Sequence, residues 1–489
     1  MKTHVAVAAA LLSLLLIAPS MSAAATEIDV PIPGLEEASG IESTQSTGSI
    51  DAVAGVLPTA GIFESERALI LQQTNALRAQ NGLPPLRLNA ALNDIAQDWS
   101  VQQARVSAMS HRPNFHALYP SGWSRASENV AAGYSASAVV GAWAASAGHR
   151  ANLLSTNTDI GIGVAANANG RLYYTQNFGR YTSTPPTPPG DVNRISGDDR
   201  FATSAQVSIR TFAAGADTVY IASGFDFPDA LSAAALAGSA GGPLLLVMPT
   251  SVPPVILTEL RRLDPDRIVV AGGSGVISES VLATLRTVTS NVDRVFGANR
   301  FETSRNLALD SYGQSGAPVV YLATGSGFAD ALAAGPAAAS VDAPVVLVHG
   351  TAPQIDAETS DLLDQLNTTR VVIVGGEGAI SQGVQQSLVS AGLTVERIAG
   401  ADRYSTAALI ASRHFPDAQR SYLATGSGFA DALSGGAAAG ALGSPLFTVL
   451  ATCVPSSAHS AINSQGPDDL VLLGGLGALT PTVAGFYRC

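Results

Sequence analysis

The decamer ATGSGFADAL spans Ala323 to Leu332 and recurs, letter for letter, from Ala424 to Leu433. A looser copy, ASGFDFPDAL, spans Ala222 to Leu231. In every copy a short apolar run typical of a strand precedes the glycine, and an alanine-rich run typical of a helix follows. The chain therefore repeats one strand–turn–helix unit three times, and the turn is either a phosphate-binding loop or a structural element.

Two further motifs accompany each decamer and define an internal repeat of about 100 residues. An arginine box precedes it: GDDRF at 197–201, GANRF at 297–301 and GADRY at 400–404. A double-glycine box follows it: VVAGGSGVIS from Val269, VIVGGEGAIS from Val372 and VLLGGLGALT from Val471. Continuous apolar strands that alternate with helices are typical of parallel sheets covered on both faces. The sequence predicts three Rossmann-like α/β repeats, each expected to be a small domain of its own.

The segment GSGFAD, from Gly325 to Asp330, nearly satisfies the G-x-G-x-x-[GA] pattern of dinucleotide-binding turns. Asp330, however, occupies the third small-residue position, where its carboxylate would face the pyrophosphate. The first copy, GFDFPD from Gly224, lacks the second glycine altogether. All three copies keep an aspartate before Ala-Leu: Asp229, Asp330 and Asp431. An acidic residue in the first turn of a helix is stabilised by the helix dipole. We therefore favour a structural turn, which leaves open a ligand groove beside it.

Composition and charge narrow the class of protein. The chain has 489 residues, of which 46% are hydrophobic, enough for about three or four domains with cores. Residues 1–25 have the pattern of a secretory signal peptide, with an apolar run from Val5 to Ile17 before an A-x-A site. No other stretch is long and apolar enough to span a membrane. The net charge of −12 argues against nucleic acid as a partner.

The charged and sulfur-containing residues are unevenly distributed. Lys2 is the only lysine, so beyond it any anionic ligand must be met by arginine, which suits bidentate phosphate or carboxylate contacts. The two cysteines, Cys453 and Cys489, both lie near the C-terminus. In an exported chain this favours one disulfide, with two free thiols as the alternative.

Linkers divide the chain. Residues 26–61 are rich in Ser, Thr, Gly and Pro, and TSTPPTPPGD at 182–191 has the composition of a stiff polyproline linker. Between them, Glu64 to Asn81 predicts a helix, Asn89 caps a second helix that runs to about Ser107, and two strands follow at 160–166 and 172–178. The expected segments are signal peptide 1–25, spacer 26–61, first domain 62–181, linker 182–191, and repeats 192–291, 292–394 and 395–489.

The span from Arg194 to Cys489 resembles the type 2 cell-wall-binding repeat family, which occurs in tandem threes on exported proteins of Gram-positive bacteria. The three boxes, in one order and at nearly one spacing, carry the resemblance. It implies three repeats packed about a pseudo-threefold axis in a monomer, held noncovalently to the wall by an anionic secondary polymer. The family's attachment tripeptide, Ile-Leu-Leu after a proline, corresponds to Leu244, Leu245 and Leu246. The match is weaker at Val345, Val346 and Leu347, and weakest at Leu446-Phe447-Thr448.

The recurrent cations of the boxes are Arg200, Arg300 and Arg403. A guanidinium can grip a phosphate or carboxylate, and three weak sites on one body gain from multivalency along a repetitive polymer. The alternative is structural, because each arginine could pair with the aspartate of the second box within its own fold.

The first domain carries five further motifs: MSHRPNF (109–115), SENVAAGY (127–134), WAASAGHRANLL (143–154), IGIGVA (160–165) and YYTQNFG (173–179). From Glu64 to about Tyr181 they resemble the bacterial branch of the CAP superfamily of cysteine-rich secretory, antigen 5 and pathogenesis-related proteins. The resemblance implies an α-β-α sandwich with a cleft lined by two histidines and acidic residues. His111 and His149 match the cleft histidines, and Glu128 matches the first acidic residue. Trp143 is followed by Ala-Ala-Ser-Ala, so the second carboxylate is missing.

Three roles stay open for this cleft. His111 and His149 could form a hydrogen-bonded structural pair, could hold a divalent metal such as zinc together with Glu128, or could include a general base polarised by Glu128. His116 matches no motif, and Trp143 is expected in the core. The sequence thus predicts a secreted wall protein of Gram-positive type whose repeats display a CAP domain. The alternative is a wall-anchored, metal-dependent hydrolase of peptide or wall substrates.

Overall fold

The computed structural model describes residues 63–489 of the chain. The chain divides into two units, Met1–Asp51 and Ala52–Cys489, and all described residues belong to the second. The predicted signal peptide and spacer lie outside the described residues. No helix within residues 63–489 combines the length and the apolar composition needed to cross a bilayer.

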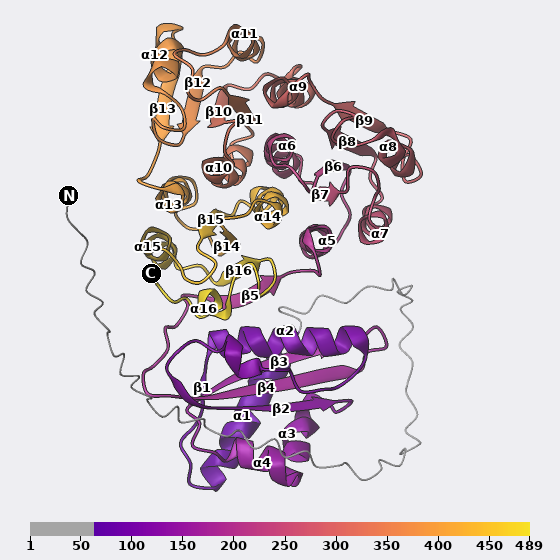
Figure 1. Cartoon of the computed structure of the whole chain (residues 1–489), viewed down its shortest axis with the longest axis vertical. Helices are drawn as coiled ribbons and strands as arrows, with labels where there is room; N and C mark the ends of the chain where they lie inside the picture. The colour runs from indigo at the N-terminus through magenta and orange to yellow at the C-terminus, as the bar shows by residue number, and fades with distance from the viewer. Residues whose placement is uncertain (1–62) are drawn as a thin grey trace, which may run out of the picture. The chain divides into compact units, whose positions relative to one another are not determined.

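The first domain is a three-layer sandwich around one mainly antiparallel sheet (Figure 1). The sheet order is β1 (Arg87–Leu88), β3 (Asp159–Ala166), β4 (Leu172–Tyr181) and β2 (Trp123–Ala132). Helix α2 (Ala90–Val106) covers one face. The other face is covered by α1 (Glu64–Gln80), α3 (Ala136–Ala145) and α4 (Ala147–Leu153), and a short 3-10 helix spans Phe115–Leu118. The α-β-α architecture implied by the sequence is confirmed.

Local sequence explains how α2 is placed on the sheet. The side chain of Asn89 accepts hydrogen bonds from the backbone N–H groups of Ala91 and Leu92, as the predicted N-cap requires. A Cβ on Gly161 would lie within 2.0 Å of the Leu92 backbone, and one on Gly163 would lie equally close to α2. Glycine at both positions of β3 therefore lets the helix rest directly on the strand. Strand β2, which overlaps the motif SENVAAGY, had not been predicted as a strand.

Each of the three repeats contributes to a four-stranded, fully parallel sheet. The first contains β7 (Leu244–Val247), β6 (Thr218–Ser223), β8 (Arg267–Ala271) and β9 (Val292–Val295) in that order. The second contains β11 (Val345–Val348), β10 (Val319–Thr324), β12 (Arg370–Val374) and β13 (Thr394–Ile398). The third contains β15 (Leu446–Val449), β14 (Arg420–Thr425), β16 (Asp469–Leu473) and β5 (Asp191–Ile195). The prediction of buried parallel sheets is confirmed.

Four helices accompany each sheet. One starts at the arginine box: α5 (Arg200–Thr211), α9 (Arg300–Tyr312) and α13 (Arg403–His414). One follows the decamer: α6 (Pro228–Ser239), α10 (Ala329–Ala339) and α14 (Ala430–Ala441). One follows the second strand: α7 (Pro254–Leu263), α11 (Ala357–Gln365) and α15 (Ser456–Gln465). The last follows the double glycine: α8 (Glu279–Leu285), α12 (Gln382–Ser390) and α16 (Pro481–Ala484).

The sheets do not coincide with the sequence repeats. The last strand of each sheet comes from the start of the next repeat, and the third sheet takes β5 from the first, with Leu472 opposite Arg194. The expectation that each repeat is a domain of its own is wrong in this respect. The predicted boundaries follow the sequence period, whereas the sheets are offset from it by one strand. Residues 191–489 therefore close into a ring.

The middle of the ring is a bundle of the three alanine-rich helices α6, α10 and α14 (Figure 1). Their residues are buried nearly all round, as is typical of a helix inside a core. A Cβ on Gly238 would lie 3.0 Å from the Cβ of Ala339 and 3.2 Å from the Cα of Gly440. At the start of the helices, the ring centroids of Phe227, Phe328 and Phe429 lie 5.5 to 6.0 Å apart. The pseudo-threefold axis implied by the resemblance runs between these helices.

The C-terminal segment is closed by the disulfide between Cys453 and Cys489, as predicted. The backbone N–H of Val454 donates to the carbonyl of Tyr487 at 2.8 Å, and the Ser456 hydroxyl donates to the carbonyl of Cys489 at 2.6 Å. These bonds fix the tail that follows α16.

Candidate functional site

The aspartate of each decamer fills the crevice at the carboxyl end of its sheet. Asp229, in the first turn of α6, lies against Gly272 of the double-glycine box, where a Cβ would come within 2.7 Å of its Oδ2 atom. Asp330 lies against Gly375 at the same distance. Both glycines have φ above +100°, a conformation that favours glycine. In open α/β sheets this crevice is where a ligand would bind, but here the carboxylate occupies it.

The arginine that faces each of these aspartates comes from the next repeat. Burial raises the pKa of Asp229, and Arg300 acts against this increase. Burial likewise raises the pKa of Asp330 and of Asp431, opposed by Arg403 and Arg200 respectively. The arginine that acts on each aspartate thus belongs to another repeat, whereas the structural alternative placed the pair within one fold.

Each of the three arginines is fixed by a single bond to its own repeat. One Nη1 group of each donates to the carbonyl of the first glycine in the decamer: Arg200 to Gly224 at 2.5 Å, Arg300 to Gly325 at 2.8 Å and Arg403 to Gly426 at 2.6 Å. Arg200 and Arg403 are exposed, and the Arg300 side chain is 37% exposed. Arg300 also lies over the axial Phe227 ring at 5.6 Å. We call Arg200, Arg300 and Arg403 the arginine circle.

The tripeptides matched to the attachment motif lie inside the sheets. All six candidate side chains are at most 2% exposed: Leu244, Leu245, Leu246, Val345, Val346 and Leu347. They belong to β7 and β11, each of which is the second strand of its sheet in chain order. Direct contact between a polymer and these side chains does not fit this burial, so their role in the folded ring is to build its core.

The first domain brings Glu128 and His111 together. Glu128 lies on β2, directly opposite Asn177 on β4. Its carboxylate is 1% exposed, and its Oε1 atom lies 2.8 Å from His111 Nδ1 and accepts from the Arg112 backbone N–H at 3.0 Å. Asn177 donates to the other oxygen at 3.2 Å. The carboxylate thus orients an imidazole whose side chain is 60% exposed, and leaves the Nε2 atom of His111 free.

His149 completes the cleft from α4. Its Nδ1 atom lies 2.9 Å from the Ser146 hydroxyl, so a serine and not a carboxylate orients this imidazole. The pKa of His149 lies below its ordinary value because of burial and, second, because of repulsion from His111. Asn129 fixes this helix to the sheet by donating to the His149 carbonyl at 3.3 Å.

Asn177, Ser146 and Asn129 lie within the CAP motifs but had not been predicted as site residues. Trp143 lies in the core, as expected, and His116 lies outside the cleft. Trp143 is 2% exposed and donates from Nε1 to the Val130 carbonyl at 3.0 Å. His116 is exposed on the short 3-10 helix.

The cleft does not fit a catalytic zinc site. Among residues 63–489, no three His, Cys, Asp or Glu side chains are gathered so that they could hold a metal ion. Both oxygens of Glu128 are already bonded, which leaves only the two imidazoles of His111 and His149. Catalytic zinc normally has three protein ligands. The geometry is that of an imidazole whose orientation is set by a buried carboxylate.

Comparison with known proteins agrees with the division of the chain into a CAP domain and a ring of three repeats. The family described as cell wall binding domain 2 (CWB2) matches residues 194–282, 294–385 and 397–484, together more than half of the chain. The cysteine-rich secretory protein family (CAP) matches residues 71–178.

Two kinds of relative are similar to the ring. The N-acetylmuramoyl-L-alanine amidase LytC of Bacillus subtilis is 27% identical over 301 residues, which cover 61% of this chain and 59% of the amidase. The solved structure of Cwp8 from Clostridium difficile is 28% identical with a TM-score of 0.55, covering 60% of this chain and 51% of that one. Cwp6 from the same organism is 23% identical with the same TM-score, covering 62% and 48%, and shows the fold alone. This chain thus spans about half of each of these relatives.

Proposed function

Because this chain belongs to the cell wall binding domain 2 (CWB2) family, with a CAP domain ahead of its repeats, we propose that the ring binds an anionic wall polymer through the arginine circle and displays the CAP domain. The chain is a secreted, cell-wall-associated protein. We propose the anionic character of the polymer, its contact residues and the role of the CAP cleft.

The observation that carries the proposal is the repeated geometry of the arginine circle. Each guanidinium is positioned by one bond to a glycine carbonyl. Arg200 and Arg403 are exposed, and Arg300 is partly exposed and also forms an ion pair with Asp226 at 3.9 Å. A planar guanidinium suits phosphate and carboxylate groups. Three such sites, related by the pseudo-threefold axis, can engage successive units of one polymer, so modest affinity at each site is sufficient.

The proposal is tested by sedimentation of the full chain with purified Gram-positive walls. We expect binding to intact walls and loss of binding once their anionic polymers are removed chemically. The double variant Arg200→Gln/Arg403→Gln should bind at least about tenfold more weakly, since two of three linked sites are lost. Arg261→Gln/Arg286→Gln is the matched control, because both residues are exposed arginines of the ring outside the arginine circle. Equal binding by the two double variants, or unchanged binding to stripped walls, would refute the proposal.

For the CAP cleft we propose a ligand-binding site in which His111 acts as the proton acceptor. The support is the 2.8 Å contact between His111 Nδ1 and the buried Glu128, which leaves Nε2 as the free acceptor. The second candidate function, hydrolysis of a peptide or wall substrate, would use the same imidazole to activate water. It involves no metal step, because the residues present do not fit one.

Incubation of the full chain with peptidoglycan fragments separates the two candidates. Hydrolysis by the wild type that falls at least about 100-fold in His111→Ala and in Glu128→Gln would support the enzyme. Binding without turnover that is lost in His111→Ala would support the ligand site. His116→Ala, an exposed histidine outside the cleft, is the control and should change neither.

A further inference from the structure

Helix α2 of the CAP domain has two packed faces. One lies on its own sheet, and the other meets β5 and α16 of the ring (Figure 1). A Cβ on Gly485, just after α16, would come within 3.1 Å of the Ala91 side chain, so the two backbones approach closely. At the far end of α2, Arg105 forms an ion pair with Asp198 of the ring. The contact therefore extends along the whole helix.

A buried ion pair lies in the middle of this contact. Arg194 on β5 donates from Nε and Nη2 to the two oxygens of Asp94 on α2, both at 2.8 Å. Each side chain is only 7% exposed. The remaining donors of Arg194 go to the ring itself, to the carbonyls of Gly474 at 2.6 Å and Leu479 at 2.8 Å. A buried guanidinium with four bonded contacts has a single arrangement in which all are made.

Arg194 has a counterpart in each of the other two sheets. Arg294 on β9 and Arg397 on β13 occupy the same register position beside the third strand. All three arginines donate from Nη1 to the first glycine carbonyl of a double-glycine box: Gly474, Gly272 and Gly375, at 2.6, 2.8 and 2.8 Å. These three bonds join ring residues only, and they follow the threefold repeat.

The outer partners of the three arginines break the threefold pattern. Glu279 on α8 accepts from Arg294 at 3.1 Å, and Gln385 on α12 accepts from Arg397 at 2.9 Å. The corresponding helix of the third sheet, α16, has only four residues, against seven in α8 and nine in α12. The first and fourth residues of α16, where α8 has Glu279 and α12 has Gln385, are Pro481 and Ala484, whose side chains accept no hydrogen bond. Asp94 of the CAP domain supplies the acceptor instead. The outer acceptor thus comes from the ring in two of the three sheets and from the CAP domain in the third.

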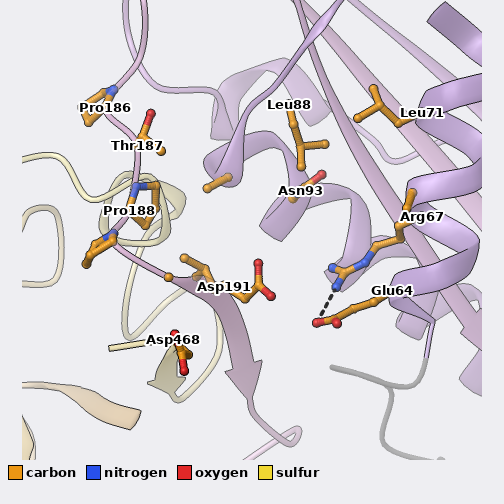
Figure 2. A pocket seen from close by; sticks show the side chains of 15 residues that line it. Glu64, Arg67, Leu71, Leu88, Asn93, Pro186, Thr187, Pro188, Asp191 and Asp468 are labelled. Carbon is orange, nitrogen blue, oxygen red and sulfur yellow. Dashed lines mark ion pairs between the residues drawn. The ribbon is translucent and has the colours of Figure 1, made fainter. Parts of the chain in front are cut away.

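The linker contributes less to this arrangement. Pro186, Thr187 and Pro188 form one side of an open groove of about 670 Å³, and Arg67, Leu71 and Leu88 of the CAP domain line the other (Figure 2). Space of this size between the linker and the domain means that the two are not closely packed there. The contact that orients the CAP domain is therefore the one made by α2.

We propose that β5, α16 and the Gly474 and Leu479 carbonyls form a built seat for α2, and that this seat holds the CAP cleft in one orientation relative to the ring. Arg194 is the key residue, since it closes the third sheet and binds the CAP domain with the same guanidinium. The partner that fits the seat is a helix with a carboxylate one turn from its start. The proposal does not depend on polymer binding, because it concerns only contacts within this chain.

The test uses the full chain with a protease recognition sequence inserted in the linker at residues 184–187. After cleavage, gel filtration shows whether the CAP fragment stays with the ring. We expect co-elution for the otherwise wild-type chain. Arg194→Met should raise the dissociation constant of the two fragments by about 100-fold or more, since Asp94 would stay buried without a partner. Arg294→Met is the matched control: it loses the equivalent bonds to Gly272 and Glu279 but faces no CAP residue, and should leave co-elution intact.

A second variant covers the case in which Arg194→Met disturbs the ring itself. Asp94→Arg changes only the CAP domain and places two cations together, so it should release the fragment from an unchanged ring. Separation of the otherwise wild-type fragments after cleavage would overturn the proposal. So would co-elution of the Asp94→Arg fragments, or equal release by Arg194→Met and Arg294→Met.

Discussion

Replacing Arg78 by methionine is expected to destabilise the CAP domain more than any exchange of an exposed arginine. Arg78 is 1% exposed, and no carboxylate within residues 63–489 forms an ion pair with it. Its guanidinium donates to four backbone carbonyls: Pro84 at 2.9 Å, Leu153 at 2.7 Å, Ser155 at 2.9 Å and Asn157 at 3.3 Å. Leu153 ends α4, which carries His149, and Ser155 and Asn157 follow it, so this one side chain holds the α4 side of the cleft in place.

The magnitude follows from what methionine leaves behind. Its side chain fills the space of the arginine stem but donates no hydrogen bond, and each buried carbonyl left without a donor costs about 1–3 kcal/mol. Relief from burying a cation offsets part of this, since burial already lowers the pKa of Arg78. We expect a net loss of about 3–5 kcal/mol, in the range for breaking a buried charged contact. Arg78→Lys keeps the charge but reaches fewer carbonyls, and should lose about half as much.

Tryptophan fluorescence measures this loss within the full chain. All three tryptophans, Trp99, Trp123 and Trp143, lie in the CAP domain, so their emission follows the unfolding of that domain and not of the ring. Urea titration of the variants gives the change in midpoint at constant slope, which converts to the change in unfolding free energy.

The control is Arg180→Met, at an exposed arginine of β4, which should stay within about 0.5 kcal/mol of the wild type. A loss below about 1 kcal/mol for Arg78→Met would refute the reasoning, because it would mean that water or rearrangement satisfies the four carbonyls at little cost.

Three further predictions test the ring and the cleft. Gly375→Ala, at φ +101° and with a carboxylate oxygen 2.7 Å from the new Cβ, should lower ring stability by at least about 1–3 kcal/mol by circular dichroism, whereas the adjacent Gly376→Ala meets no atom within 4 Å and should be neutral. His111→Ala should raise the pKa of His149 toward 6.5 without reaching it, since burial remains; a histidine NMR titration that shows no increase contradicts their electrostatic contact. Asp402→Ala should cost about 1 kcal/mol of cap energy. Because the bond from the Ser405 backbone lowers the pKa of Asp402, this difference should be present above pH 3.8 and disappear as pH falls through the lowered pKa, while Asp402→Asn should not titrate.

The sequence was most informative where structure depends on near neighbours. Asn89 and the spacing of apolar residues in 90–106 predicted α2 to within about one residue, because capping and amphipathic periodicity are local properties. The histidines and Glu128 were found through motifs in the order of the CAP family. Ser146 and Asn177 were not, because a hydroxyl or amide in a motif does not reveal which neighbour it will bond.

In the ring, too, the sequence did not predict which distant residues would face one another. Its boxes predicted three α/β repeats, but not that Arg300 would face Asp229 of the preceding repeat. They also suggested polymer contact for Leu244 to Leu246, which burial in β7 makes unsuitable. A box identifies a residue type and a local conformation, whereas its neighbour across the ring depends on how three units close on one another.

Taken alone, the amino-acid sequence determined the fold class, the number of repeats and the resemblance to both families, and it favoured the disulfide, since periodicity, glycine spacing, cysteine position and motif order are properties of the linear chain. Only the tertiary structure decided that β5 completes the third sheet and that Arg194 reaches Gly474, 280 positions away, and Asp94 of the CAP domain together. The physical reason is ring closure. It brings together three segments that are distant in the sequence, and Pro481 and Ala484 of α16 provide no acceptor for Arg194, which Asp94 of the CAP domain supplies.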